Sequence, residues 1–176
     1  MANTALSLWR YLNSALILCF ALAVDAQDAA PAPDSVHVAV PGKSAIDVDR
    51  AMMATMERIS VTAAAHEEKS SEWRGVALRD ILLRAGAPLD KPLRGKALAM
   101  VVRVTATDHY QVVFALSDFD PSLGNAPVLL VDQRDGQPLA SDGPFRLLVK
   151  GDQRPARWVR SVSSIEVVDA STARQP

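Results

Sequence analysis

Short segments in which apolar and polar residues alternate recur along most of the chain, and this pattern restricts the folds that it can adopt. Residues 35–40 read SVHVAV, and their three valines share one face, as in a half-buried β-strand. Pro41-Gly42 follows as a turn, and Asp135-Gly136 supplies a second, tight turn. Comparable patterns predict strands at residues 58–65, 126–132, 145–149 and 164–168, and a pair of strands around Thr107-Asp108-His109. The residues expected to face the core from that pair are Leu98, Met100, Val102, Val104, Val112 and Phe114.

Two segments show the spacing of an amphipathic helix. The first has an acidic cap available at Asp47 or Asp49. Its inward-facing residues are expected to be Val48, Met52, Met53 and Met56. The second and clearer helix lies within EWRGVALRDILLRAGAP, residues 72–88, where Gly86 is a natural stop and Pro88 prevents continuation. Its buried face is expected to hold Leu78, Ile81, Leu82 and Ala85.

The balance of these elements predicts the fold class. Many strands, two modest helices and no regular βαβ alternation indicate an α+β domain with a mixed or antiparallel sheet. We find no internal repeat.

The N-terminal residues have the three-part layout of a secretory signal peptide: a basic residue, an apolar run of about ten residues from Ala15, and a small-residue cleavage site at Ala26. A membrane anchor would need about 20 apolar residues. Leu18 stands before Cys19 where a lipoprotein would have a small residue. We therefore expect a periplasmic or secreted protein with no membrane span after cleavage. Its expected parts are a signal peptide at 1–26, a flexible Ala/Pro-rich tether at 27–35, a folded domain at 36–169 and a C-terminal tail at 170–176.

Cysteine usage and charge exclude several functions. Cys19 is the single cysteine, so the processed chain would have no disulfide, no thiolate nucleophile and no cysteine-based metal site. The net charge of -1 does not favour nucleic acid as a partner. The three histidines, His37, His66 and His109, are widely scattered, and their spacing does not predict a zinc site.

Residues 146–160, here called the basic segment, concentrate positive charge. They contain Arg146, Lys150, Arg154, Arg157 and Arg160, together with Trp158. One interpretation is an anion-binding site, because guanidinium forks suit phosphate oxygens and a tryptophan offers a flat wall. The alternative is structural: Arg146 and Arg160 point outward from strands, Arg154 and Arg157 pair with Asp152 or Asp142, and Trp158 belongs to the core.

Asp108-His109-Tyr110 forms a second cluster of candidate residues. Asp108 can cap its own turn, and His109 tolerates a left-handed backbone better than most residues. These are properties of an ordinary hairpin bend. The functional interpretation is a histidine that exchanges protons near neutral pH.

Four segments, taken in order, resemble the sulfite-oxidase-type molybdopterin-binding domain family. EWRGVALRDILLRAG (72–86) is similar to its aromatic-x-G-x-x-L-x-x-L-L-x-x-A-G segment, and TATDHYQVVFAL (105–116) to its hairpin with Asp-Gly-Tyr at the bend. VLLVDQRDGQPLASDGPFRLLVKGD (128–152) and RWVRSVSSIEV (157–167) resemble its Asn/Asp-Gly-x-x-Leu, Gly-Pro-x-Arg-Leu and closing-strand motifs.

The resemblance implies an α+β molybdopterin-binding fold, truncated at its N-terminal half, and molybdopterin as the cofactor. In such enzymes a cysteine thiolate from that half binds molybdenum, and basic residues near the C-terminal end of the domain help to hold the pterin's phosphate. The resemblance thus marks the basic residues of the basic segment, Trp158 and the bend residues Asp108, His109 and Tyr110 as cofactor-binding candidates. This chain has no cysteine after position 19, His109 replaces the glycine of the bend, and Lys150 stands where a proline is common.

These observations predict an exported binding or partner module without redox catalysis of its own. Its expected partners are an anionic small molecule or an exported redox protein. The alternative is an active molybdopterin-dependent oxidoreductase that holds its cofactor without a protein thiolate. A third interpretation is a purely structural domain.

Overall fold

The computed structural model describes residues 34–64, 69–140 and 142–171. All of the described residues belong to one compact unit of the chain. The expected signal peptide therefore lies outside the described residues, as do His66 and most of the expected tether. No helix among the described residues has the length and apolar character needed to cross a membrane.

The first sheet joins the two ends of the domain. Its strands are β1 (Ser35–Ala39), β2 (Ile46–Asp49), β5 (Met100–Ala106), β6 (Gln111–Ala115) and β10 (Val162–Asp169), in the spatial order β2-β1-β10-β5-β6. The first and last strands, β1 and β10, run parallel, with Val38 opposite Ile165. The other neighbouring pairs are antiparallel. The middle strand of this sheet is thus β10, the last of the described strands in the sequence.

The neighbouring strands of the second sheet are all antiparallel. Its strands are β3 (Ile59–Ala63), β4 (Ser71–Ala77), β7 (Val128–Arg134), β8 (Gln137–Pro138) and β9 (Arg146–Val149). The order is β3-β4-β7-β8, and β9 also pairs with β7. Asp135 and Gly136 join β7 to β8, and both have positive φ, at 51° and 76°. This is the backbone of a tight two-residue turn, as the Asp-Gly sequence predicts.

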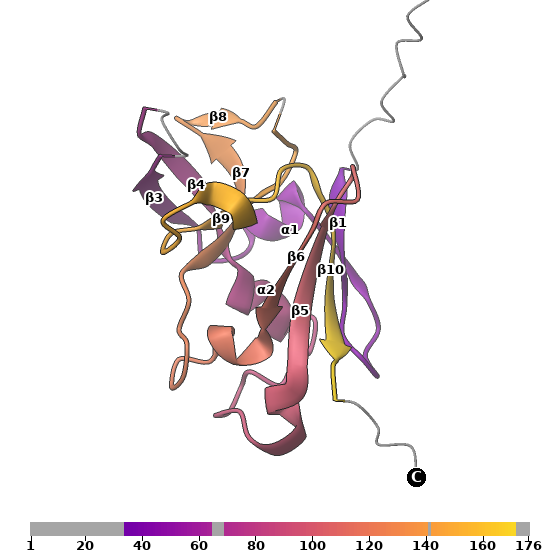
Figure 1. The fold of residues 1–176 in the computed structure, drawn as a ribbon. Helices are drawn as coiled ribbons and strands as arrows, with labels where there is room; N and C mark the ends of the chain where they lie inside the picture. Colours follow the sequence, from indigo (N-terminus) through magenta and orange to yellow (C-terminus); the bar gives the residue numbers. More distant parts are fainter. Residues whose placement is uncertain (1–33, 65–68, 141, 172–176) are drawn as a thin grey trace, which may run out of the picture. The chain divides into compact units, whose positions relative to one another are not determined.

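Figure 1 shows the two sheets as separate layers, with the short helices α1 (Arg50–Ala54) and α2 (Leu78–Arg84) drawn between them. The Asp49 side chain accepts a hydrogen bond from the amide of Met52, at 2.7 Å, and thereby caps α1. Gly86, with φ of 89°, follows the end of α2, where a left-handed residue commonly ends a helix. Three 3-10 helices complete the described elements: η1 (Gly95–Ala99), η2 (Leu116–Phe119) and η3 (Pro155–Arg157).

A single hydrophobic core is shared by both sheets and both helices. The buried face of α2 is as predicted, because Leu78, Ile81, Leu82 and Ala85 are all buried. The α+β class and the mixed sheet pairing are confirmed.

Three expectations about local structure were incomplete or wrong. The strands β2 and β4 were missed, because each runs directly into a helix with no glycine or proline to separate them. Leu98 was expected to face the core from a strand, but it lies in η1 and is 48% exposed. The strand itself begins at Met100. The alternation of apolar residues in β5 extends by coincidence to Leu98, although this residue lies in the 3-10 helix before the strand.

Candidate functional site

The connection between β9 and β10 carries most of the basic segment, and it packs against the hairpin bend that joins β5 to β6. The Tyr110 hydroxyl donates a 2.8 Å hydrogen bond to the backbone carbonyl of Ala156, in η3. The structure thus brings together the two clusters of candidate residues that lie about fifty positions apart in the sequence.

The bend itself has the geometry of a capped turn. The Asp108 carboxylate accepts a 2.9 Å hydrogen bond from the amide of Tyr110, and His109 has a φ of 69°. This left-handed conformation suits glycine, which is the residue that the resembling enzymes carry there. Asp108, His109 and Tyr110 are all exposed, so the bend offers its side chains to the surface.

Arg157 is held in a paired, partly buried position. Its Nε donates to the Asp152 carboxylate at 2.8 Å, and its Nη2 donates to the other carboxylate oxygen. Its guanidinium carbon lies 4.7 Å from the centre of the Phe114 ring on β6. The hydrogen bonds from Arg157 to Asp152 raise the pKa of the guanidinium above its ordinary value. The pairing with Asp152 confirms one part of the structural interpretation.

Arg146 is buried, which contradicts the expectation that it points outward from its strand. Only 2% of the residue is exposed. Its guanidinium carbon lies 5.0 Å from the ring centre of Trp73 and 5.8 Å from that of Trp158, and its Nη1 donates to Asp142 at 2.6 Å. Two aromatic faces and a carboxylate compensate for the removal of this charge from water.

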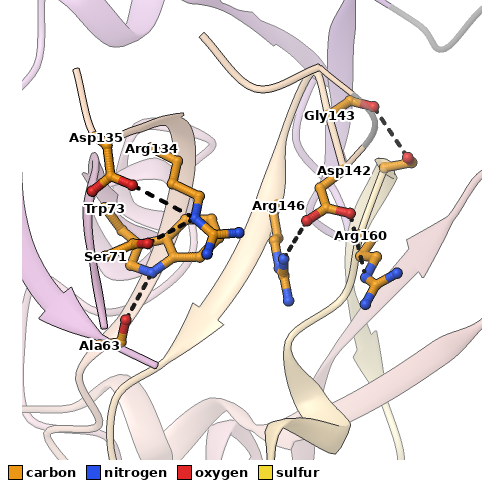
Figure 2. Close-up of polar contacts among 10 residues, drawn as sticks. Ala63, Ser71, Trp73, Arg134, Asp135, Asp142, Gly143, Arg146 and Arg160 are labelled. Carbon is orange, nitrogen blue, oxygen red and sulfur yellow. Dashed lines mark hydrogen bonds and ion pairs between the residues drawn. The ribbon is translucent and has the colours of Figure 1, made fainter. Parts of the chain in front are cut away.

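The Asp142 carboxylate links the buried and the exposed parts of the basic segment. Figure 2 shows it between Arg146 and Arg160. Its second oxygen lies 3.5 Å from Nε of Arg160, whose side chain is 64% exposed. Arg160 therefore points outward as expected, although it lies in the connection before β10 and not in a strand.

Trp73 and Trp158 pack beside these charged side chains, on the side of the core. Trp158 is 7% exposed, which confirms it as a core residue, and its ring meets that of Trp73 edge-on, with centres 6.3 Å apart. The indole nitrogen of Trp158 donates to the carbonyl of Val149 at 2.9 Å. Arg134 packs its guanidinium carbon 4.8 Å from the centre of the Trp73 ring and donates to Ser71 at 2.9 Å. Trp158 is thus oriented by its own hydrogen bond.

The remaining cations of the basic segment face solvent. Lys150 and Arg154 are exposed. No ion pair of either is found among the described residues, which include Asp142 and Asp152. Together with Arg160, these residues give the surface of the β9–β10 connection a positive charge.

Metal-binding groups are not gathered in the described part of the chain. No set of three or more His, Cys, Asp or Glu side chains is arranged there to hold a metal ion. Cys19 lies outside the described residues.

A pocket of about 320 Å³ beside the second sheet was missed by the sequence reasoning. It is formed by β3, the start of α2, the segment after η2, β7 and Lys150. Because these segments are far apart in the chain, no local motif could have identified it.

Two sheets around a common core, with two short helices, define an α+β domain. The model of the oxidoreductase molybdopterin binding domain matches residues 33–175. The chain belongs to this family.

A solved structure shows the same fold. The sulfane dehydrogenase SoxCD from Paracoccus pantotrophus matches with a TM-score of 0.58 and 18% sequence identity. The match covers 77% of this chain and 38% of the SoxCD chain, so this chain spans well under half the length of that protein. No curated protein matches this sequence.

The residues present fit one end of a molybdenum cofactor better than the other. Lys150, Arg154 and Arg160 supply exposed cations of the kind that bind phosphate oxygens. A soft thiolate, which suits the metal, is not found among the described residues. The site therefore has the donors for an anionic pterin side chain but not a cysteine ligand for molybdenum.

Proposed function

We propose that this chain is an exported, molybdopterin-domain-like binding module that acts in an exported redox system without redox catalysis of its own. Membership of the family supports a molybdopterin-oxidoreductase-like module. One observation carries the rest. The β9–β10 connection offers exposed cations to an anion, whereas no cysteine follows Cys19 to anchor a metal.

The proposed ligand is an anionic small molecule with phosphate chemistry, of which a molybdopterin is the family's example. Lys150, Arg154 and Arg160 would contact the phosphate oxygens, and Asp142 and Asp152 would fix neighbouring guanidinium groups in place. Because Tyr110 is hydrogen-bonded to Ala156, the bend of Asp108, His109 and Tyr110 would form the side of the site. When bound, a molybdenum cofactor supplies oxygen-atom transfer. The residues described here would bind and orient it.

The metal content of the purified protein tests the absence of catalysis. The full chain is expressed in cells that make the cofactor, and molybdenum and pterin fluorescence are measured per chain. We expect molybdenum far below stoichiometry. Stoichiometric molybdenum would overturn the proposal and establish the alternative function.

That alternative is an active molybdopterin-dependent oxidoreductase which holds its cofactor through pocket contacts alone. The observation in its favour is that the family match continues through the whole basic segment. It requires that metal-loaded protein oxidise or reduce a substrate. It also requires that the double variant Arg157→Ala with Arg160→Ala lose its cofactor.

A double variant tests the binding role of the basic segment. Arg157→Ala with Arg160→Ala should weaken the binding of inorganic pyrophosphate, measured by calorimetry. It should lower the melting temperature only a little, because the Arg157 and Arg160 side chains keep 41% and 64% of their surface exposed and ion pairs open to solvent contribute about 0–1 kcal/mol each. Arg84→Ala with Arg94→Ala removes two exposed cations elsewhere and serves as the control. A loss of stability with unchanged pyrophosphate binding would show that Arg157 and Arg160 are structural.

Export is proposed from the N-terminal sequence, and cell fractionation with mass spectrometry tests it. We expect the protein outside the cytoplasm with Gln27 as its first residue. An intact N-terminus in the cytoplasmic fraction would contradict this part of the proposal.

A further inference from the structure

The pocket beside the second sheet has the size and lining of a small-molecule site. Its volume of about 320 Å³ lies at the lower end of the range for ligand pockets, which are typically about 300–1,000 Å³. Ile59 and Val61 line it from β3, and Val128 and Leu129 line it from β7. These side chains provide an apolar interior suited to a hydrocarbon group.

One wall of the pocket is fixed by the segment after η2. The amide of Ala126 donates to the carbonyl of Asp118 at 2.7 Å, and the amide of Val128 donates to the carbonyl of Ala126 at 2.9 Å. Ala126 lines the pocket. Because these short-range hydrogen bonds hold the backbone, the wall is formed before any ligand arrives.

The charged residues that line the pocket are both cationic, Arg79 and Lys150. The Arg79 guanidinium donates to the carbonyl of Leu89 at 3.0 Å and lies 3.7 Å from the half-exposed Asp80. The amide of Lys150 donates to the carbonyl of Pro127, another lining residue, at 3.2 Å. The acidic side chains of the described residues are absent from the lining. An apolar interior with positive charge at its border complements an amphipathic anion.

We infer that this pocket binds a small organic anion, namely a carboxylate or a similar anionic head on a short hydrocarbon body. The hydrocarbon body lies against Ile59, Val61 and the β7 residues, and the anionic head faces Lys150 and Arg79. This site goes beyond the proposed function, which concerns phosphate chemistry at the β9–β10 connection. The two sites share Lys150, at the end of β9.

Three ligands with the same hydrocarbon body test the inference: hexanoate, hexan-1-ol and hexylammonium. Each is titrated into the ¹⁵N-labelled full chain at neutral pH, and amide shifts are followed by NMR. We expect hexanoate to bind with a Kd on the order of 1 mM, as suits a ligand of this size. Hexan-1-ol should bind several-fold more weakly and hexylammonium most weakly. The shifts should centre on Ala77, Ala126 and Val128.

Two variants separate the charge from the cavity. Lys150→Gln should weaken hexanoate about 2- to 5-fold, as expected for an exposed charge, and leave hexan-1-ol unchanged. Arg154→Gln, which removes an exposed cation that does not line the pocket, should change neither ligand. Ala126→Phe fills the cavity and should abolish binding of both.

Several results would overturn the inference. These are equal affinity for the three ligands, shifts away from the pocket, or hexanoate binding that survives in a folded Ala126→Phe variant. Lys150→Gln changes an exposed side chain, so the charge test stands even where the phenylalanine variant fails to fold. The pyrophosphate test changes Arg157 and Arg160, which do not line the cavity, and the molybdenum measurement changes no residue, so failure of either test would leave this result unaffected.

Discussion

The hydroxyl of Tyr110 donates a 2.8 Å hydrogen bond to the carbonyl of Ala156, and this contact joins the β5–β6 bend to the connection that carries the basic segment. Tyr110 is itself 49% exposed. The contact therefore lies at the surface, where it fixes the position of a loop and contributes little to the core.

Removal of this hydrogen bond should loosen the loop more than it destabilises the protein. Tyr110→Phe should lower the free energy of unfolding by about 0.5–1.5 kcal/mol, the usual net contribution of one hydrogen bond. Hydrogen exchange at the amide of Trp158, which donates to Pro155 within η3, should become faster. Val113→Ala changes a comparably exposed residue of the same hairpin and is the control. Unchanged exchange in Tyr110→Phe would show that the loop is held by other contacts.

The buried and exposed arginines that share Asp142 should differ widely in their effect on stability. Arg146→Ala removes a buried guanidinium and leaves Asp142 without its 2.6 Å partner. It should cost about 3–5 kcal/mol in urea unfolding. Arg160→Ala, at the same carboxylate, should cost less than about 1 kcal/mol. Arg146→Lys should not restore stability, because an ammonium lacks the planar fork that stacks on tryptophan. Similar costs for the two alanine variants would contradict the assignment of Arg146 to the core.

A close contact between β4 and β7 makes Gly75 intolerant of a side chain. A Cβ there would lie 2.1 Å from the carbonyl oxygen of Leu130, and the register of the strand pair shifts between Arg74 and Gly75. Gly75→Ala should therefore destabilise the protein by about 1–3 kcal/mol or more. At Gly151 an added Cβ meets nothing within 4 Å, so Gly151→Ala is the matched control and should be nearly neutral. Thermal unfolding of both variants makes the comparison.

The lowered pKa of the Asp120 carboxyl group leads us to expect that the stability of the protein depends on pH in the acidic range. The hydroxyl of Ser122 lowers its pKa most, followed by the amides of Leu93 and Ser122 and the charge of Arg79. A carboxyl with a lowered folded pKa stabilises the protein above its unfolded pKa, and this contribution is lost as the pH falls through the folded value. Stability should therefore fall below about pH 4, the ordinary range for aspartate.

Asp120→Asn tests this assignment. The variant should be less stable at neutral pH, and its free energy of unfolding should change less with pH in the acidic range. Asp135→Asn, at an exposed turn residue, is the control and should keep the slope of the wild type. A wild-type slope in Asp120→Asn would show that other carboxyls cause the acid sensitivity.

Local sequence signals predicted the elements that depend on local chemistry. The Asp135-Gly136 turn and the stop at Gly86 follow from backbone conformations that few residues adopt. The face of α2 follows from its spacing. The boundary between β4 and α2 could not be read in this way, because Val76, Ala77 and Leu78 suit either element.

Among the charged residues too, contacts between residues close in the sequence were predicted, and contacts between distant segments were not. Arg157 and Asp152 are five positions apart, and their pairing was among the expectations. Arg146, in contrast, owes its burial to Trp73, a residue from a different strand that lies 5.0 Å away. Alternation of apolar and polar residues along β9 could not predict that Arg146 is buried, since all four residues of that strand are buried. The pocket beside β3 and β7 likewise depends on tertiary packing.

The position of β10 has a consequence for how the nascent chain matures. This strand follows all the other described elements in the sequence, yet it lies between β1 and β5 and pairs with both. Until residues 162–169 have left the ribosome, the β2–β1 pair and the β5–β6 pair have no strand between them, so the first sheet is completed only when β10 arrives.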